Sequence, residues 1–343
     1  MKTSANMTRL QPANSSSGSA ATSSLADLTS ELKTPLLTAG SRLPMIRNLL
    51  ASLVLCRVYA LRHHSSRCSP RYSSSLSDVS RYPSVSLEEL LKGVENHPDN
   101  SPPRPAQLKN KYYGLRHGES EANLAGVISS DPYIGATKHG LTSNGILQAR
   151  NAAKCVIEKI GRDNLQNTVF LSSNFKRARE TAIECIDALC QNFYLELIPY
   201  KDAQTEDLTE DLAQRLQQSK RLLDYFVGVT PFVREELRER FFGELDGSVL
   251  INYNRVWPVD LLDAFNHRQK VESVHDVIMR AARLVESLEM EYEGKHIIFA
   301  SHADTLQIFQ TYLNRSDPRK FSMYRFKNGE VSCDMILFCL KKL

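Results

Sequence analysis

Short apolar runs alternate with amphipathic stretches through the part of the chain that follows residue 110. Short strand-like runs separated by helix-length segments predict an α/β fold. We expect strands at residues 112–115, 169–171, 195–200, 297–300 and 335–338. We expect helices at residues 142–160, 175–189, 206–226 and 274–288, and a further helix that follows the 297–300 strand through residue 313. The expected architecture is a three-layer sandwich whose central, mostly parallel sheet is flanked by helices.

The segment before residue 108 lacks this alternation. Residues 1–75 contain 16 Ser and 9 Lys and Arg, but only two acidic residues, Asp27 and Glu31. A Ser-rich, Arg-containing and acid-poor segment is typical of a mitochondrial or plastid transit peptide. A plain disordered tail on a cytoplasmic protein is the alternative. The Pro-rich run at 101–105 indicates a linker, so we divide the chain into a disordered, low-complexity leader with its linker at 1–107 and one folded domain at 108–343.

The apolar stretch at 43–61 is a candidate membrane segment within the leader. Arg47 and Arg57 interrupt it and leave nine residues between them. A membrane-spanning helix needs about 20 apolar residues, and a secretory signal begins much closer to the amino terminus. We therefore expect neither a membrane span nor a secretory signal.

The net charge of +4 is spread unevenly along the chain. Residues 1–110 carry 13 basic and 7 acidic residues, whereas residues 111–343 carry 30 basic and 32 acidic residues. The folded part is close to neutral and has no basic run, so its charge gives no indication of nucleic-acid binding. The seven Cys include no Cys-x-x-Cys pair, which argues against a disulfide framework and against a thiolate zinc site. We expect reduced thiols in an intracellular compartment.

Two histidines and two arginines follow the ends of predicted strands. Arg116 and His117 come directly after the strand at 112–115, and Arg177 lies one helical turn after the strand at 169–171. His302 follows the strand at 297–300. Ligands of such sheets bind at the carboxyl ends of the strands, so we expect these four side chains to converge on one site.

Such a cluster is suited to phosphoryl transfer. Arginine forks match the oxygens of a phosphoryl group, and their charge lowers the pKa of a histidine between them below about 6.5. A neutral imidazole is a nucleophile, and two arginines with a second histidine would stabilise the transferred group without a metal. The leaving oxygen also needs a proton. Glu239 is the first candidate for this acid, and Glu244 and Asp246 are the alternatives.

Residues 115–123, Leu-Arg-His-Gly-Glu-Ser-Glu-Ala-Asn, resemble the signature of the histidine phosphatase superfamily, which includes the cofactor-dependent phosphoglycerate mutases. Further matches follow in the order of the family over about residues 110–343. They are Leu141-Thr142 with Gly145 and Gln148-Ala149, Ser173 with Arg177-Ala178 and Thr181-Ala182, Glu239 with Gly243 and Gly247, and Ser301-His302. This ordered series of matches supports the resemblance to the family much more strongly than the short Arg-His-Gly motif does alone.

The resemblance implies a role for each matching residue. His117 would be phosphorylated during the cycle, and Glu239 would protonate the leaving oxygen and later activate water. The residues that the resemblance assigns to phosphate binding are Arg116, Ser120, Asn123, Arg177 and His302. It implies no metal and no bound organic cofactor, and a small phosphorylated metabolite as the binding partner. The oligomeric state stays open.

The chain departs from the mutases at two of these motifs. Residues 239–243 read Glu-Arg-Phe-Phe-Gly where the mutases carry Glu-Arg-His-Tyr-Gly, and the usual Gly after the last motif histidine is Ala303 here. Asp304 follows, and we expect it to point away from the site because a carboxylate would repel an anionic substrate. We expect residues 129–139 to wall the entrance and the added polar helix within 202–230 to act as a lid. We expect Trp257 to pack or to line the entrance, and Tyr253 and Arg255 are candidates for contact with substrate.

Three functions remain open on this evidence. We favour a metal-independent phosphatase that hydrolyses a small phosphomonoester through a phosphohistidine. A mutase would instead return the phosphoryl group to its substrate, and the loss of the His-Tyr pair weighs against it. A third reading is a phosphate-site scaffold of low activity that binds a protein partner. A bisphosphorylated sugar, a phosphoserine-like metabolite and a phosphoprotein all stay open as substrates.

Overall fold

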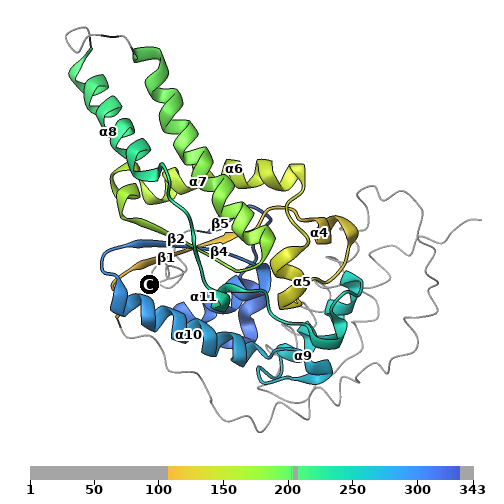
Figure 1. Ribbon diagram of the computed structural model, residues 1–343. Helices are drawn as coiled ribbons and strands as arrows, with labels where there is room; N and C mark the ends of the chain where they lie inside the picture. Colours follow the sequence, from red (N-terminus) through yellow and green to blue (C-terminus); the bar gives the residue numbers. More distant parts are fainter. Residues whose placement is uncertain (1–106, 202, 204–207, 333–343) are drawn as a thin grey trace, which may run out of the picture. The chain divides into compact units, whose positions relative to one another are not determined.

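A computed structural model describes residues 107–201, 203 and 208–332, and Figure 1 shows how their helices and strands are arranged. The expected leader at 1–106 and the expected strand at 335–338 lie outside the described residues. The division of the chain at residue 107 therefore stays a prediction.

A five-stranded sheet lies at the centre of the described part. Its order is β3-β2-β4-β1-β5, and all neighbours are parallel except the antiparallel pair β1 and β5. The strands are β1 (Lys111–Arg116), β2 (Thr168–Ser172), β3 (Phe232–Val233), β4 (His296–Ser301) and β5 (Val331–Ser332). The predicted α/β class and mostly parallel sheet are confirmed.

Helices cover both faces of the sheet, because each strand sends alternate apolar side chains to opposite sides. Tyr112 and Phe299 belong to a core formed with α10 and α11, whereas Tyr113 and Ile298 belong to a second core formed with α6, α7 and α8. The longer helices are α6 (Ser143–Ile160), α7 (Lys176–Leu197), α8 (Glu210–Phe226), α10 (Val274–Glu291) and α11 (Ala303–Leu313). Three short helices are α4 (Glu121–Ala125), α5 (Pro132–Thr137) and α9 (Trp257–Asp260). The three-layer arrangement is thus present.

The strand predicted at 195–200 is wrong. Helix α7 continues through Leu197, and a short 3₁₀ helix, Ile198–Tyr200, follows it. The helical register brings Glu196 to Arg162, which donates to both carboxylate oxygens at 2.9 and 3.0 Å. The alternating pattern of this short run could not show that bidentate pair, which anchors the end of the helix.

Helices α7 and α8 form a hairpin whose far end extends beyond the other described elements (Figure 1). Ser219 on α8 accepts from Arg162 at 2.7 Å, and Arg162 lies just before β2, at the amino-terminal edge of the sheet. The carboxyl ends of the strands lie at the opposite edge. The position of α8 therefore does not fit the lid that we expected from this segment.

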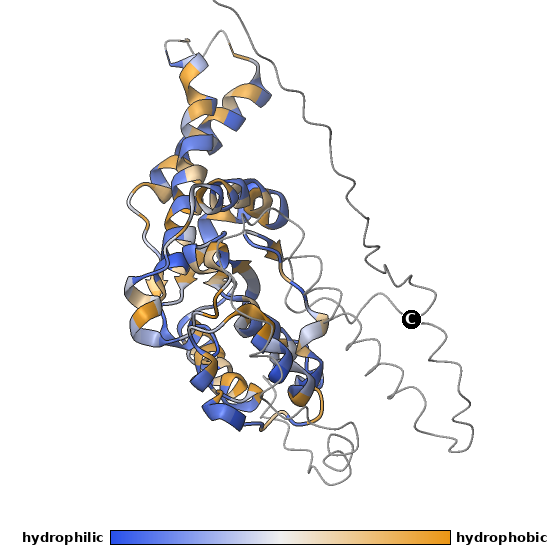
Figure 2. Cartoon of the chain, turned by 90° about the vertical axis from the view of Figure 1, so that its right-hand side faces the viewer, coloured by the Kyte–Doolittle hydropathy of each residue, from blue (hydrophilic) through white to orange (hydrophobic). Residues whose placement is uncertain are grey.

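Hydrophobic residues continue to the far end of that hairpin, at the top of Figure 2. Tyr194 and Leu195 are 56% and 52% exposed there. Within the described part of the chain, no helix combines the length and the apolar character that a membrane crossing requires.

Candidate active site

Three strand ends bring the predicted site residues together. Arg116 is the last residue of β1 and pairs with Ser301 at the end of β4, while Ser172 of β2 pairs with Ala300. The backbone N–H of His117 donates to the Ser301 carbonyl at 2.9 Å, and that of Ser173 donates to the Ala300 carbonyl at 2.9 Å. These bonds fix the loops after β1 and β2 against β4, so His117, Arg177 and His302 meet at one edge of the sheet.

Two glycines permit the turn that follows His117. A Cβ on Gly118 would collide with the Gly145 carbonyl oxygen, and a Cβ on Gly145 would collide with the Glu119 carbonyl oxygen. The loop after β1 and the start of α6 thus pack backbone against backbone. Thr142 caps α6 by accepting from the Gly145 N–H at 3.1 Å.

The hydrogen bonds of His117 define its tautomer. Nε2 lies 3.2 Å from Nε of Arg177, which can only donate, so Nε2 is the acceptor and carries no proton. Nδ1 lies 2.7 Å from the Gly118 carbonyl and therefore donates to it. Burial, followed by the charges of Arg177 and Arg116, lowers the pKa of His117 well below its usual value. The imidazole is thus neutral, with its Nε2 lone pair on the side of the site.

Arg177 is a buried cation that lines the site. It lies in the first turn of α7 and donates to the Ser129 carbonyl at 2.9 Å and to the Ser129 hydroxyl at 3.4 Å. Burial lowers the pKa of Arg177 to about 10, against the raising effect of the Glu239 carboxylate. The predicted role of residues 129–139 as a wall agrees with this contact, because Ser129 lies directly against the guanidinium.

His302 lies opposite His117, with the two ring centroids 5.1 Å apart. It directly precedes α11, and its Nε2 shares a 3.0 Å hydrogen bond with the Ser173 hydroxyl. Its Nδ1 is buried and has no hydrogen-bond partner among the described residues. Burial, followed by the charges of Arg177 and His117, lowers the pKa of His302 well below its usual value.

Arg116 is held by a segment close to β5. Its Nη1 donates to the Phe326 carbonyl at 2.7 Å, whereas its buried Nε has no hydrogen-bond partner within the described chain. Asn328 donates to the His117 carbonyl at 3.1 Å. The guanidinium therefore keeps a donor for a ligand while the backbone around His117 is fixed.

Ser120 and Asn123 have a structural task at the start of α4. The Ser120 side chain accepts from the Asn123 N–H, and Asn123 Oδ1 accepts from the Ser120 N–H, which together form a capping box. Asn123 Oδ1 also lies 3.4 Å from Nδ2 of Asn328. The described contacts of these two residues thus hold the loop after β1, and their predicted contact with a phosphoryl group stays a prediction.

Glu239 is a buried acid within electrostatic reach of the two arginines. Its Oε1 accepts from the Arg240 N–H at 3.0 Å and from the Thr305 hydroxyl at 3.3 Å. Burial raises the pKa of Glu239, although the charges of Arg177 and Arg116 act in the opposite direction. The carboxyl therefore holds a proton at a higher pH than an ordinary glutamate does.

The two alternative acids are engaged elsewhere. Glu244 is exposed and forms an ion pair with Lys270 at 3.1 Å. Asp246 Oδ1 accepts from the N–H and hydroxyl of Ser130 at 2.5 and 2.7 Å and from the Asp131 N–H at 3.0 Å. Of these three acids, Glu239 is the buried one, and its role as the proton donor stays a prediction.

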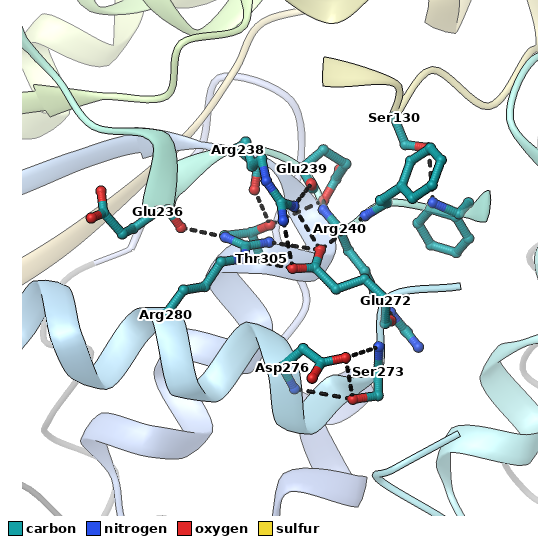
Figure 3. Close-up of polar contacts among 12 residues, drawn as sticks. Ser130, Glu236, Arg238, Glu239, Arg240, Glu272, Ser273, Asp276, Arg280 and Thr305 are labelled. Atoms are coloured by element: carbon teal, nitrogen blue, oxygen red, sulfur yellow. Dashed lines mark hydrogen bonds and ion pairs between the residues drawn. The ribbon is translucent and has the colours of Figure 1, made fainter. Parts of the chain in front are cut away.

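A second layer of charges fixes the segment that carries Glu239 (Figure 3). Glu272 accepts from both Nη atoms of Arg238 at 2.7 and 2.8 Å and from Arg280 Nε at 3.0 Å. Glu272 also accepts from the Phe241 N–H at 3.0 Å. Although burial opposes it, the charge of Arg280 and the bonds from Arg238 lower the pKa of Glu272 to about 2. A charged Glu272 therefore holds the backbone on both sides of Glu239.

Asp304 is directed toward Trp257 and Arg240. Its Oδ2 accepts from the Trp257 indole N–H at 3.0 Å and lies 3.8 Å from Nη1 of Arg240. Burial, followed by the charge of Glu239, raises the pKa of Asp304 to about 7. The expectation that this carboxyl points away from the site agrees with these contacts.

A family model matches residues 113–196 and 212–334, and its description is histidine phosphatase superfamily (branch 1). These ranges contain every predicted site residue. The chain belongs to the histidine phosphatase superfamily. The residues between the two matched ranges include the end of α7 and the start of α8.

The search of solved structures found phosphatases that are similar to this chain. One is a phosphoserine phosphatase variant from Entamoeba histolytica in complex with phosphoserine, at 20% identity and a TM-score of 0.43, covering 65% of this chain and 88% of that chain. Another is a mycobacterial glucosyl-3-phosphoglycerate phosphatase in complex with vanadate, VO3, at 19% identity and a TM-score of 0.44, covering 64% of this chain and 90% of that chain. The search of curated proteins found no match.

Three contacts around the site escaped the sequence analysis. Thr305 bonds to the Glu239 carboxyl, Asn328 bonds to the carbonyl of His117, and Arg240 forms a fully buried pair with Asp260. Thr305 follows the Ser301-His302 motif closely, so its position offered a signal. Asn328 and Arg240 lie far along the chain from their partners, and only the fold brings them together. No group of three or more potential metal ligands occurs among the residues with a described position.

Proposed function

We propose that the protein is a metal-independent phosphatase that hydrolyses small phosphomonoesters through a phosphohistidine on His117. The observation that carries the proposal is the neutral His117 imidazole, whose unprotonated Nε2 faces Arg177 at 3.2 Å. A lone pair fixed beside a cationic fork suits attack on an anionic phosphorus centre. Membership of the superfamily supports the same reaction class.

In the first step, the Nε2 lone pair of His117 attacks phosphorus and forms an N–P bond. The bond between phosphorus and the ester oxygen breaks, and its electron pair goes to that oxygen. Glu239 gives its proton to the leaving oxygen, because the raised pKa of its carboxyl keeps that proton available. The products of this step are the alcohol and phosphorylated His117.

In the second step, water replaces the alcohol. The Glu239 carboxylate takes a proton from water, and the oxygen of that water attacks phosphorus. The N–P bond breaks, its electron pair returns to Nε2 of His117, and inorganic phosphate leaves. The free enzyme is restored with Glu239 protonated and His117 neutral.

In the proposed reaction, three side chains hold the phosphoryl oxygens. Arg177 Nε already points at the attacking nitrogen, Arg116 has a buried donor without a partner in the described chain, and His302 lies across the site from His117. Preorganised donors of this kind stabilise charge that develops in the transition state. In the proposed reaction, the hydrogen bond that Arg177 Nε–H donates would change its acceptor from the His117 imidazole to a phosphoryl oxygen.

The test is phosphate release from a panel of phosphomonoesters by the full chain in the presence of EDTA. We expect release that persists in the chelator and is abolished by His117→Ala. His267→Ala is the matched control, because His267 is an exposed histidine outside the site. Release by the His117→Ala variant would exclude the phosphohistidine route. Transfer of the phosphoryl group to an acceptor, without phosphate release, would instead identify a mutase.

A further inference from the structure

Three aromatic rings form a continuous wall close to the proposed proton donor. The Tyr253 and Trp257 rings are stacked, with centroids 4.6 Å apart and planes inclined by 3°. The Phe242 ring meets Tyr253 edge-on at 4.8 Å. We call Phe242, Tyr253 and Trp257 the aromatic wall. Phe242 is fully buried, whereas Tyr253 and Trp257 are half-buried, so the wall has one accessible side.

Hydrogen bonds tie both ends of the aromatic wall to the site. At one end, the indole N–H of Trp257 donates to Asp304 in the first turn of α11, the helix that follows His302. At the other end, the Phe242 N–H donates to the Ser130 hydroxyl at 2.9 Å, directly after the residue that holds Arg177. The wall therefore spans from the helix behind His302 to the loop behind Arg177.

The Tyr253 hydroxyl lies in the field of the reacting groups. The pKa of Tyr253 is raised because burial and the charges of Glu239 and Asp304 disfavour the phenolate, while Arg177 and Arg116 act in the opposite direction. The hydroxyl is thus a neutral donor within electrostatic reach of both the acid and the phosphate clamp. Among the described residues, it makes no hydrogen bond. An available donor at this position is suited to contact a ligand.

The positions of these charges indicate which part of a substrate Tyr253 meets. Arg116 and Arg177 bind the phosphoryl oxygens in the proposed reaction, and Glu239 protonates the ester oxygen. The leaving group extends from that ester oxygen, past the carboxyl and away from the arginines. The geometry points to Tyr253 as a substrate-binding residue that donates a hydrogen bond to the leaving group, held in place by the stack on Trp257 and the Trp257–Asp304 bond.

This inference rests on the proposed phosphatase activity and narrows its substrate class. A single hydroxyl donor close to the ester oxygen favours a leaving group with a hydrogen-bond acceptor on the neighbouring carbon. Phosphate esters of polyols, sugars and hydroxy acids have such an acceptor, whereas simple alkyl phosphates do not. One neutral hydrogen bond corresponds to about a threefold to tenfold preference.

Glycerol phosphate and propyl phosphate form the matched pair of probes, because both have alkyl leaving groups and only the first carries hydroxyls. We expect the full chain to hydrolyse glycerol phosphate with the higher kcat/KM. Tyr253→Phe is expected to lower kcat/KM about threefold to tenfold for glycerol phosphate and to leave propyl phosphate within about twofold. The preference would then disappear in the variant.

Two further variants separate positioning from general damage. Trp257→Phe removes the indole N–H that Asp304 holds, and we expect it to weaken the same preference. The double variant should be no worse than Tyr253→Phe, because Trp257 acts through Tyr253. Tyr194→Phe is the control, because it removes an exposed tyrosine hydroxyl at the far end of α7. It should leave both substrates unchanged.

Equal losses for both substrates, or no loss for either, would overturn the role of Tyr253. Binding of the two esters to His117→Ala, measured by calorimetry, keeps this test independent of turnover. If His117→Ala binds glycerol phosphate more tightly than propyl phosphate and Tyr253→Phe removes that difference, the inference holds even if the wild-type chain releases no phosphate. If the esters bind equally while the wild-type chain is active, the inference fails and the proposed phosphatase activity stands.

Discussion

Arg177 donates its Nε–H to Nε2 of His117 at 3.2 Å, so the cation is directed at the lone pair that the proposed reaction uses. The same guanidinium is held from behind by the carbonyl and hydroxyl of Ser129. This arrangement sets the proton position on His117 and also places a donor where phosphoryl oxygens would bind. Each of these consequences can be measured separately.

Arg177→Gln removes the charge from the site and keeps a polar side chain of similar reach. We expect kcat/KM to fall about a hundredfold or more, in line with the loss of one preorganised transition-state donor. Steady-state kinetics on a phosphomonoester measure the effect. Arg179→Gln makes the same change two residues along α7, where the side chain donates to the Ala136 carbonyl. A similar loss in both variants would show that the helix, rather than the Arg177 donor, is responsible.

The lowered pKa of His117 predicts that kcat/KM persists to a lower pH than an ordinary histidine would allow. Burial and the charges of Arg177 and Arg116 lower this pKa, so the imidazole stays neutral as the pH falls through about 6.5. We expect kcat/KM to show no loss centred near that pH. In Arg177→Gln the pKa of His117 should rise, and the acid limb should move to higher pH. An acid limb near pH 6.5 in the wild-type chain, assigned to His117 by NMR titration, would contradict the prediction.

Glu239→Gln removes the proposed acid while keeping its size. Alkyl phosphates need a proton on the leaving oxygen, so we expect their first step to slow about a hundredfold or more. Aryl phosphates with good leaving groups should lose far less in that step, which a pre-steady-state burst of the phenol would report. Glu244→Gln is the control, because Glu244 is exposed and paired with Lys270. Equal losses for the alkyl and aryl esters would show that Glu239 is not the acid.

The buried pair of Arg240 and Asp260 makes a prediction about stability. Its hydrogen bonds are 2.6 and 2.8 Å long, and both side chains are fully buried. Asp260→Asn leaves the guanidinium charge without its partner, so we expect a loss of about 3–5 kcal/mol in the free energy of unfolding. Urea denaturation measures this change. Glu184→Gln breaks the exposed pair with Arg150 and should cost less than about 1 kcal/mol; comparable losses would contradict this account.

The sequence predicted the parts of the fold that depend on periodicity and local signals. The strand that ends at Arg116, the strand that precedes His302 and helix α6 were all predicted at the positions where the structure has them. Strands β3 and β5 were not predicted, because each has only two residues, which are too few to show an alternating pattern. The run at 195–200 was misread because a short apolar alternation does not distinguish a strand from the end of a helix.

The site could be predicted where each residue follows a strand end. His117, Arg177 and His302 meet because the parallel strands share one edge. The contacts that support these site residues could not be predicted, because they join segments that lie far apart in the sequence. Glu272 holds the segment around Glu239, and Asp304 holds Trp257, from positions that no local pattern connects. Ser120 illustrates the converse, because its place in the motif does not show that it caps a helix.

Strand β1 directly precedes His117, the nucleophile of the proposed reaction, yet both strands that pair with it come much later in the chain. It pairs with β4, which begins at His296, and with β5, which begins at Val331, while Asn328 bonds to the carbonyl of His117. A ribosome makes the chain from the amino end, so the Arg-His-Gly motif is synthesised long before anything can pair with it. A nascent chain interrupted before β4 would contain His117 without the sheet that positions it. The proposed site would therefore be assembled only after β4 and β5 have been made, which lengthens the interval in which β1 depends on protection from aggregation.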